Sequence, residues 1–164
     1  MQEKLVRLAG QKDLEIRTIT LADLENLRAW KNTHRMFFFH REEIQPIQQE
    51  RWFAGYVQRS DDYMFIVEVE GRAVGCMGIR LLTDGWDVYN VILGLTEYAG
   101  RGLMSRAFQL MLRFARKRNH HPINLNVLKH NPAIGWYQKN GFQITSDGGA
   151  HFVMLHVAAQ AGSP

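Results

Sequence analysis

One stretch of the sequence combines glycines, an arginine and the start of an amphipathic segment in a way that suits phosphate binding. It covers residues 95–105 and reads Leu-Thr-Glu-Tyr-Ala-Gly-Arg-Gly-Leu-Met-Ser. Gly100 and Gly102 permit a tight turn and a close approach of the backbone to a ligand. The first amides of a following helix have no partner inside the helix, so this turn predicts an anion site, to which Arg101 adds a charge. The alternative is a plain strand-to-helix connection. The stretch lacks the Lys-Ser/Thr of a Walker loop and the third glycine of a dinucleotide fingerprint.

A second stretch, residues 126–142, places polar side chains around a short helical pattern. Asn131 is a good N-cap, and Pro132 suits the first helical position, where its missing N–H costs nothing. Gly141 is placed to end the helix. Tyr137 lies within two turns of the helix start. The structural alternatives are plain capping by Asn131 and a packed ring with a surface hydroxyl for Tyr137.

The elements that must position these stretches alternate between strand and helix patterns. The patterns predict strands over residues 14–19, 63–69, 73–82, 86–95, 123–128, 142–145 and 151–157. They predict helices over residues 21–30, 47–58, 100–118 and 131–140. The consecutive hairpin strands in the middle of the chain exclude a purely parallel sheet and favour a mixed α+β sheet.

The composition is that of one globular domain. The chain has 164 residues, of which 46% are hydrophobic and 22% charged. These values allow a sizeable core and argue against a disordered chain. We expect a single domain over residues 1–164, with loosely attached ends at 1–13 and 158–164.

Several functional classes do not fit the sequence. Cys76 is the single cysteine, which excludes an internal disulfide and a multi-cysteine metal site, and His120 and His121 lack a spaced carboxylate or cysteine, so no metal is expected. We see no apolar signal segment and no run of about 18 apolar residues, so we expect a cytoplasmic protein without a membrane partner. The net charge of +4 is modest, and no continuous basic stripe indicates a nucleic-acid partner.

Together, the two stretches resemble the GCN5-related N-acetyltransferase (GNAT) family. The acetyl-CoA motif of that family reads Gln/Arg-x-x-Gly-x-Gly/Ala, and residues 97–102 match it except at the first position, Glu97. The later family pattern Asn-x-x-Ala-x-x-x-Tyr-x-x-x-Gly-Phe is followed, with a small shift in spacing, by Asn131, Ala133, Tyr137, Gly141 and Phe142. The resemblance implies a mixed, mostly antiparallel central sheet with helices on both faces. It also implies a splayed strand pair that forms the acetyl-CoA cleft.

The resemblance also implies an activity, the transfer of an acetyl group from acetyl-CoA to a primary amine by direct attack. Amides after Gly100 would hold the pyrophosphate, and backbone groups of residues 91–93 would bind the pantetheine arm and polarise the thioester carbonyl. Tyr137 would protonate the departing thiolate, and Asn131 would bond the arm or the loop that carries it. The implied cofactor contacts are Val91, Ile92, Leu93, Gly100, Arg101, Gly102, Leu103, Met104, Ser105, Asn126, Asn131 and Tyr137. Glu97 would weaken the phosphate site unless it pairs, and Arg101 is an available partner.

The general base has three side-chain candidates. The family often uses a glutamate on the strand before the glycine turn, and an ungapped alignment places Tyr89 there. Asp87 lies two residues earlier on the same face, and Glu68 on a neighbouring strand is the third candidate. A water relay would need none of them.

The acceptor is expected to be a small-molecule or peptide amine. In the family, the region of the aromatic run at residues 36–40 forms much of the acceptor pocket, although core packing is the plainer interpretation. The Trp30-Lys31-Asn32 element loosely resembles a subgroup that acetylates ribosomal-protein N-termini or amino sugars, but Gln49 stands where that subgroup often has histidine. A homodimer is compatible with the resemblance, because dimers are common in the family. The second hypothesis is a non-catalytic acyl-CoA-binding module or sensor of the same fold.

Overall fold

A computed structural model of the chain describes residues 4–157. Within these residues the chain forms eight strands: β1 (Arg7–Ala9), β2 (Leu14–Thr18), β3 (Asp62–Val69), β4 (Arg72–Leu82), β5 (Gly85–Leu93), β6 (Ile123–Leu128), β7 (Phe142–Asp147) and β8 (His151–His156). The four α-helices of the same part are α1 (Leu24–Thr33), α2 (Pro46–Tyr56), α3 (Leu103–Arg118) and α4 (Ile134–Lys139). Short 3-10 helices cover Leu21–Asp23, Arg35–Phe37 and Thr96–Tyr98.

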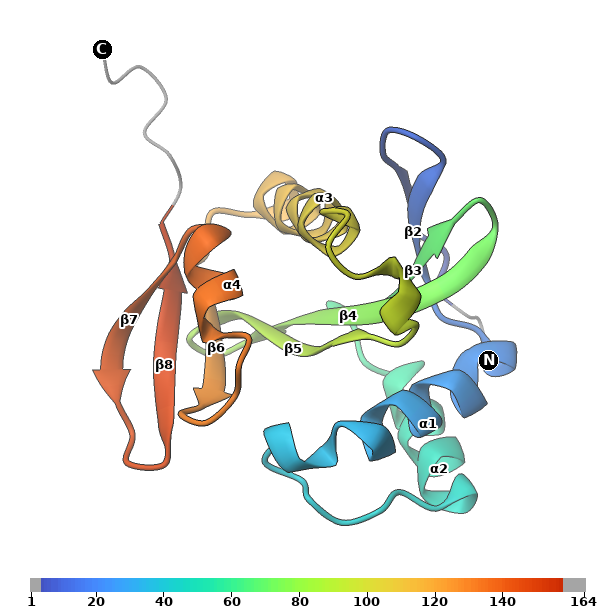
Figure 1. Cartoon of the computed structure of the whole chain (residues 1–164), viewed down its shortest axis with the longest axis horizontal. Helices are drawn as coiled ribbons and strands as arrows, with labels where there is room; N and C mark the ends of the chain where they lie inside the picture. The colour runs from blue at the N-terminus through green and yellow to red at the C-terminus, as the bar shows by residue number, and fades with distance from the viewer. Residues whose placement is uncertain (1–3, 158–164) are drawn as a thin grey trace.

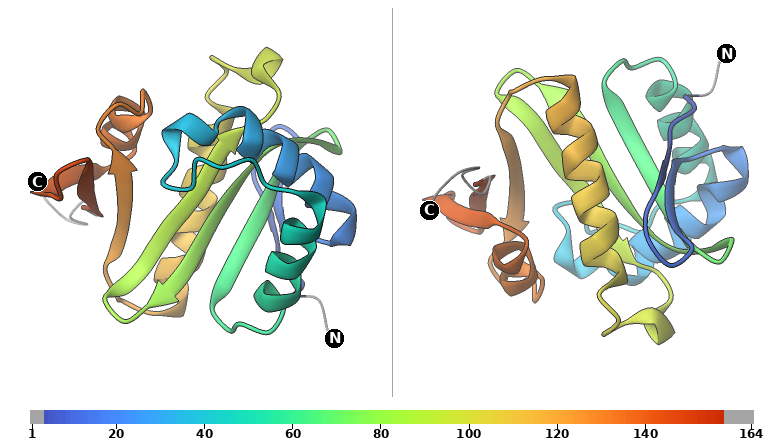
Figure 2. Two further views of the ribbon diagram at one scale, coloured as in Figure 1. Left: turned by 90° about the horizontal axis from the view of Figure 1, so that it is seen from below. Right: turned by 90° about the horizontal axis from the view of Figure 1, so that it is seen from above.

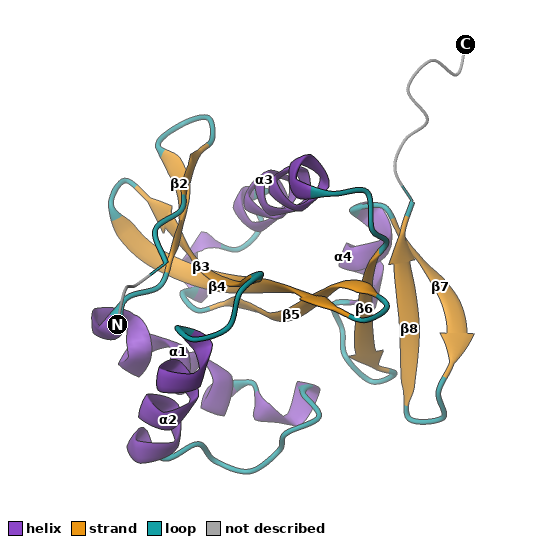
Figure 3. Cartoon of the chain, turned by 180° about the vertical axis from the view of Figure 1, so that it is seen from behind, coloured by secondary structure: helices purple, strands orange, loops and turns teal. Residues whose placement is uncertain are grey.

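The strands form one sheet in the order β1-β2-β3-β4-β5-β6-β8-β7. All neighbouring pairs in it are antiparallel except β5 and β6, which are parallel. Helices α3 and α4 lie on one face of the sheet, and α1 and α2 lie on the other (Figures 1 and 2). Figure 3 shows the sheet between these two helix pairs from behind. This is the expected α+β class with helices on both faces.

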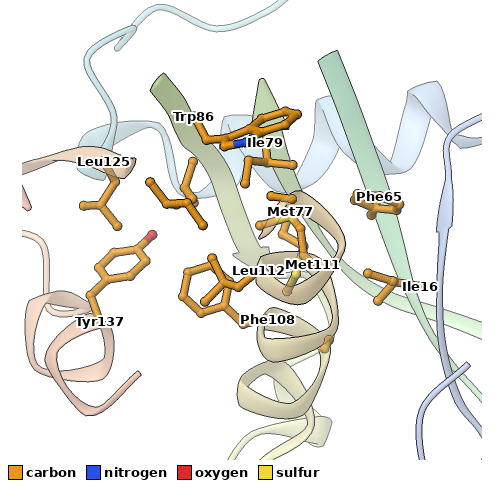
Figure 4. Packing of buried hydrophobic residues seen from close by; sticks show 14 of the residues in the cluster. Ile16, Phe65, Met77, Ile79, Trp86, Phe108, Met111, Leu112, Leu125 and Tyr137 are labelled. Carbon is orange, nitrogen blue, oxygen red and sulfur yellow. The ribbon is translucent and has the colours of Figure 1, made fainter. Parts of the chain in front are cut away.

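Each face of the sheet has its own hydrophobic cluster. Under α3, the fully buried Phe108 and Met111 pack among side chains that include Trp86 of β5 (Figure 4). Under α1 and α2, Trp30 and Tyr56 pack in a second, smaller cluster. Burying large side chains of this kind contributes about 1.5–3 kcal/mol each. Packed helices therefore stabilise the sheet on both faces.

Several predicted boundaries were wrong, among them the helix expected over 21–30, which is α1 at Leu24–Thr33 after a 3-10 turn. Three other errors have identifiable reasons. Residues 7–9 belong to a strand that pairs with β2, so the segment 1–13 is not a loose end throughout; residues 158–164 lie outside the described part. Helix α3 begins at Leu103 and not at Gly100, because Gly102 takes the left-handed conformation with φ +70°. Helix α4 begins at Ile134 and not at residue 131, because a separate turn comes first.

Candidate active site

The parallel strands β5 and β6 separate after a short paired section. Only three register pairs join them, from Trp86↔Ile123 to Val88↔Leu125. Beyond Val88 the edge of β5 that faces β6 has no partner strand, so its backbone groups are available to another molecule. The predicted splayed strand pair is therefore present.

A β-bulge in β5 helps to produce this separation. The register with β4 shifts between the pairs Gly78↔Tyr89 and Cys76↔Ile92, and Asn90 adopts a positive φ of 50°. A bulge increases strand twist and changes the face to which later side chains point. Tyr89 and Ile92 consequently lie in the same hydrophobic cluster, beside α1 and α2. The side chain of Ile92 therefore does not line the cleft where a cofactor contact was expected, and only its backbone could serve there.

The predicted anion turn has an open backbone. Gly100 and Gly102 have φ values of +76° and +70°, and a Cβ added to either would meet no atom within 4 Å. The cap position of α3 has no side-chain hydrogen bond, and the first helical amide to bond inside the helix is that of Arg106, to the Gly102 carbonyl at 3.1 Å. The amides of the first helical turn are thus left for an external acceptor, at the positive end of the helix dipole.

This turn borders a cleft of about 440 Å³, which we call the turn cleft. It is lined by Val91, Leu93, Tyr98, Ala99, Gly100, Gly102, Leu103, Met104, Ser105, Ala133 and Trp136. The lining joins the end of β5, the first turn of α3 and the start of α4. An apolar arm attached to an anionic group fits such a lining.

Arg101 and Glu97, at the mouth of this turn, do not pair with each other. The guanidinium of Arg101 lies 5.1 Å from the ring of Tyr98. The Glu97 carboxylate instead pairs with Arg72 of β4, with 3.2 Å between Oε1 and Nη2. The expected partner of Glu97 was wrong, because β4 passes beside the turn, a proximity that the local sequence does not reveal.

A second space of about 320 Å³, the central cavity, lies where β5 and β6 separate. Its lining includes five predicted site residues: Asp87, Tyr89, Asn126, Asn131 and Tyr137. Its remaining lining is Lys31, Phe37, Phe38, Phe39, His40, Trp52, Arg80, Val88, Asn90, Leu125 and Val127. Residues of the aromatic run at 36–40 thus line this cavity.

Tyr137 is buried at the edge of the central cavity. Its ring packs against Phe108 and Phe142, with ring centres 6.0 Å away in each case. Its hydroxyl points toward the side of Leu125 (Figure 4), and within residues 4–157 it has no hydrogen-bond partner. Burial raises the pKa of Tyr137 above its ordinary value, so the hydroxyl remains protonated at neutral pH.

The three base candidates differ in their access to the cavity. Asp87 pairs with Arg80 across the strands, with 3.0 Å between Oδ2 and Nε, and burial raises its pKa. The Tyr89 hydroxyl donates to the buried carboxylate of Asp62, and burial raises the pKa of Tyr89 well above its usual value. Glu68 pairs with Arg17 and does not line the cavity, so it is removed as a candidate.

The side chain of Asn131 is hydrogen-bonded to nearby backbone groups. Its Oδ1 accepts from the Ala133 amide at 2.9 Å, and its Nδ2 donates to the Phe37 carbonyl at 3.4 Å. It therefore caps the turn before α4 and not the helix itself. The neighbouring His130 also contacts the loop after α1, with its Nε2 2.7 Å from the Met36 carbonyl oxygen. These bonds hold the loop after α1 against the segment that follows β6. Figure 2 shows the ribbons of these two segments from two sides.

The sequence interpretation missed a third space, the deep cavity, which lies under α1 and α2. Its volume is about 320 Å³, and it is lined by Leu27, Lys31, His40, Ile44, Gln48, Gln49, Trp52, Met64, Cys76, Asn90 and Ile92. Lys31, His40, Trp52 and Asn90 line both this space and the central cavity, so the two adjoin. A signal was available, because Lys31 follows the buried Leu27 by four residues and so shares the inner face of its helix.

Two further findings concern the part of the chain that the structure describes. No helix among residues 4–157 is long and apolar enough to cross a membrane. In the same range, no three His, Cys, Asp or Glu side chains come together in a way that could hold a metal ion.

Comparison with known proteins adds evidence on family and fold. A family model described as the acetyltransferase (GNAT) family matches residues 21–142. No curated protein gives a significant sequence match.

Three solved structures illustrate the similarity in fold. A domain from Methanocaldococcus jannaschii DSM 2661 is 22% identical with a TM-score of 0.76, over 87% of this chain and 96% of that one. A ribosomal-protein-alanine N-acetyltransferase from Brucella melitensis is 18% identical with a TM-score of 0.70, over 87% and 99%. A spermidine N-acetyltransferase from Vibrio cholerae, in complex with CoA and spermine, is 19% identical with a TM-score of 0.71, over 87% and 93%.

Proposed function

The chain belongs to the acetyltransferase (GNAT) family, whose model matches well over half of its sequence, and from this premise we propose that it is an N-acetyltransferase. It moves the acetyl group of acetyl-CoA to a primary amine by direct attack. The acceptor is a small molecule or a peptide. Solved structures of similar fold include enzymes named for both kinds of acceptor, a ribosomal protein and spermidine.

One observation carries this proposal: the separation of β5 from β6, with the open turn at one end and Tyr137 at the other. The chain's own groups fit acetyl-CoA there. The free amides after Gly102 and the helix dipole suit a pyrophosphate, and the apolar turn cleft suits a pantetheine arm. The unpaired edge of β5 offers backbone groups to that arm and to the thioester carbonyl.

Side chains of the central cavity would handle the protons. An ammonium acceptor must lose a proton before its nitrogen can attack, and Asp87 is positioned to accept it, because its pKa is raised by burial and it lines the cavity. Tyr89 is held by Asp62 and forms the wall beside it. The buried hydroxyl of Tyr137 donates a hydrogen bond to the leaving sulfur. With its raised pKa it acts mainly as a donor that stabilises the thiolate as the C–S bond breaks.

The test is a screen of primary amines with acetyl-CoA, in which free thiol release and the mass of the acetylated product are both measured. We expect thiol release that depends on at least one amine. Calorimetry of CoA binding runs in parallel. CoA binding without turnover on a broad panel would favour the non-catalytic module, and absence of CoA binding would overturn the proposal as a whole.

A further inference from the structure

The deep cavity contains a cation without an anionic partner. The ammonium of Lys31 donates to the side-chain oxygen of Asn90 and lies 3.8 Å from the centre of the Phe38 ring. No carboxylate of residues 4–157 lies within 4.0 Å of it. Lys31 is partly buried, and burying a charge is costly unless another group compensates it.

The charged and titratable neighbours of Lys31 do not compensate it. Cys76 lies at the base of the cavity, and burial raises its pKa to about 12, so the thiol is neutral at pH 7. Arg80 is a second cation and is paired with Asp87. His40 also lines the cavity and adds no negative charge. Burial accordingly lowers the pKa of Lys31 to about 8.

A second polar group points to the same kind of ligand. Gln49 of α2 is only 9% exposed and lines the deep cavity. In the part of the chain that the structure describes, its side-chain amide makes no hydrogen bond to protein, and its polar atoms are not among the fully buried ones without a partner. The amide is therefore accessible from the cavity and available to a ligand. An ammonium and an amide that are both donors, in a cavity with walls such as Leu27 and Ile92, match the oxygens of a carboxylate at the end of a short apolar chain.

We propose that the deep cavity is a carboxylate subsite of the acceptor. The acceptor is then a primary amine that also carries a carboxylate, held by Lys31 and Gln49, with its amino end in the adjoining central cavity. This inference rests on the proposed acetyltransferase function. A polyamine acceptor would instead bring a second cation towards Lys31, and the repulsion would disfavour it. The volume of about 320 Å³ limits the carboxylate end to a small molecule or one acidic side chain.

The first experiment does not depend on turnover. It follows the ¹³Cε resonance of Lys31 in lysine-labelled protein during a pH titration, with the resonance assigned by its loss in Lys31→Arg. The probes are ω-amino carboxylates of increasing chain length and their matched carboxamides. We expect at least one carboxylate to raise the pKa of Lys31 while its carboxamide leaves it unchanged. If no carboxylate shifts the titration at tens of millimolar, or if the carboxamides shift it equally, the subsite does not exist.

The second experiment measures the same pairs as acceptors. In the wild-type protein we expect kcat/KM to favour the carboxylate over its carboxamide by at least about tenfold, which corresponds to roughly 1.4 kcal/mol. Lys31→Met should remove this preference, and Gln49→Leu should reduce it. Lys117→Met, at an exposed position of α3, is the matched control and should keep it. Equal preference in Lys31→Met and the wild type would overturn the inference.

The two experiments separate this inference from the proposed function. If a carboxylate raises the pKa of Lys31 but no amine is acetylated, the carboxylate subsite is supported and the proposed acetyltransferase activity is contradicted. If neutral or cationic amines are acetylated in preference, and Lys31 does not respond to carboxylates, the enzyme assignment stands and the subsite falls.

Discussion

The turn cleft and the deep cavity lie on opposite faces of β5, and they differ in the groups that they offer to a ligand. The turn cleft is a backbone site, created by two left-handed glycines, free amides and the end of β5. The charged side chains near it contact protein groups, Arg101 the ring of Tyr98 and Glu97 the guanidinium of Arg72. The deep cavity is a side-chain site, where Lys31 of α1 and Gln49 of α2 meet Asn90 of β5. A backbone site is sufficient for a ligand that does not vary, such as the CoA of the proposed reaction. A side-chain site can select among acceptor amines that differ in charge.

The difference also explains why the two sites respond differently to substitution. A backbone site is damaged by changes in φ or by a side chain placed over the amides. A side-chain site is altered by a single change of charge while the fold remains. Four predictions test this contrast, from the largest expected effect to the smallest.

The largest effect is expected from a negative charge at Gly102. Asp and Asn both tolerate a left-handed backbone better than most residues, and a Cβ at Gly102 meets nothing within 4 Å. Gly102→Asp and Gly102→Asn therefore form a matched pair that differs mainly in charge. One unit of repulsion at about 4 Å and an effective dielectric of about 20 costs roughly 4 kcal/mol, so Gly102→Asp should weaken CoA binding about a thousandfold.

Calorimetry of CoA binding and a thermal melt of each variant measure this. Gly102→Asn should lose less than about tenfold in affinity, and the two variants should melt at similar temperatures. Equal affinities in the two variants would show that the pyrophosphate does not lie over this turn.

A smaller effect is expected from Tyr137→Phe. Because burial raises the pKa of Tyr137, its hydroxyl contributes a hydrogen bond and little acid strength. We expect kcat to fall about tenfold to a hundredfold, or roughly 1.4–2.7 kcal/mol, with KM nearly unchanged. Steady-state kinetics on the acceptor found in the screen measure this. Tyr63→Phe, an equally buried tyrosine under α3, is the control, and equal rates in both variants would remove Tyr137 from the mechanism.

A stability effect is expected at Lys31. Its pKa is 10.5 in the unfolded chain and about 8 in the folded protein. Between these values the unfolded state binds more protons, so this group makes stability rise with pH; below about 8 the fold carries the full cost of the buried charge. Lys31→Met should therefore increase the free energy of unfolding by on the order of 1–3 kcal/mol at pH 7 and by much less at pH 10.

Denaturant unfolding of both proteins at the two pH values measures this prediction. All other titrating groups are shared, so they cancel in the difference between the proteins. If the difference in free energy of unfolding between the two proteins does not change with pH, the Lys31 ammonium is solvated. The deep cavity would then hold no desolvated charge that could select a ligand.

The extent to which sequence predicted each site follows from the same contrast. The glycine turn occupies consecutive residues, so the spacing of Gly100 and Gly102 was sufficient to predict a tight turn before a helix, although not that the helix begins only at Leu103. The capping box at Thr20 and Asp23 is a local feature of the same kind. Local patterns also gave most of the strands and helices, and hence the α+β class. The bulge at Asn90 had no such signal, because it depends on the register with β4.

Long-range partners explain the remaining errors. Glu97 pairs with Arg72 and Glu68 pairs with Arg17, and each partner lies on a different strand. The segment around residues 7–9 looked loose because its strand is only three residues long and is stabilised by pairing with β2. The spacing from Leu27 places Lys31 on the inner face of its helix, but the cavity around it depends on the packing of α2 against α1, which the local spacing does not reveal.

The smallest effect is expected from Glu97→Gln, where the family motif has glutamine or arginine. A free carboxylate beside the turn would repel a pyrophosphate, but Glu97 is paired with Arg72 at 3.2 Å, and both side chains are more than half exposed. Exposed pairs of this kind contribute about 0–1 kcal/mol, and screening reduces their field beyond about 10 Å at 0.1 M salt. The affinity for CoA should therefore change by less than about twofold at 0.1 M salt. Calorimetry of CoA binding to Glu97→Gln, Arg72→Gln and the double variant measures this. If Arg72→Gln weakens CoA binding several-fold and the double variant restores it, then pairing with Arg72 is what prevents the Glu97 carboxylate from repelling the pyrophosphate. If Glu97→Gln alone improves binding more than fivefold, the pairing does not neutralise that charge, and the turn cleft depends on side-chain charges as the deep cavity does.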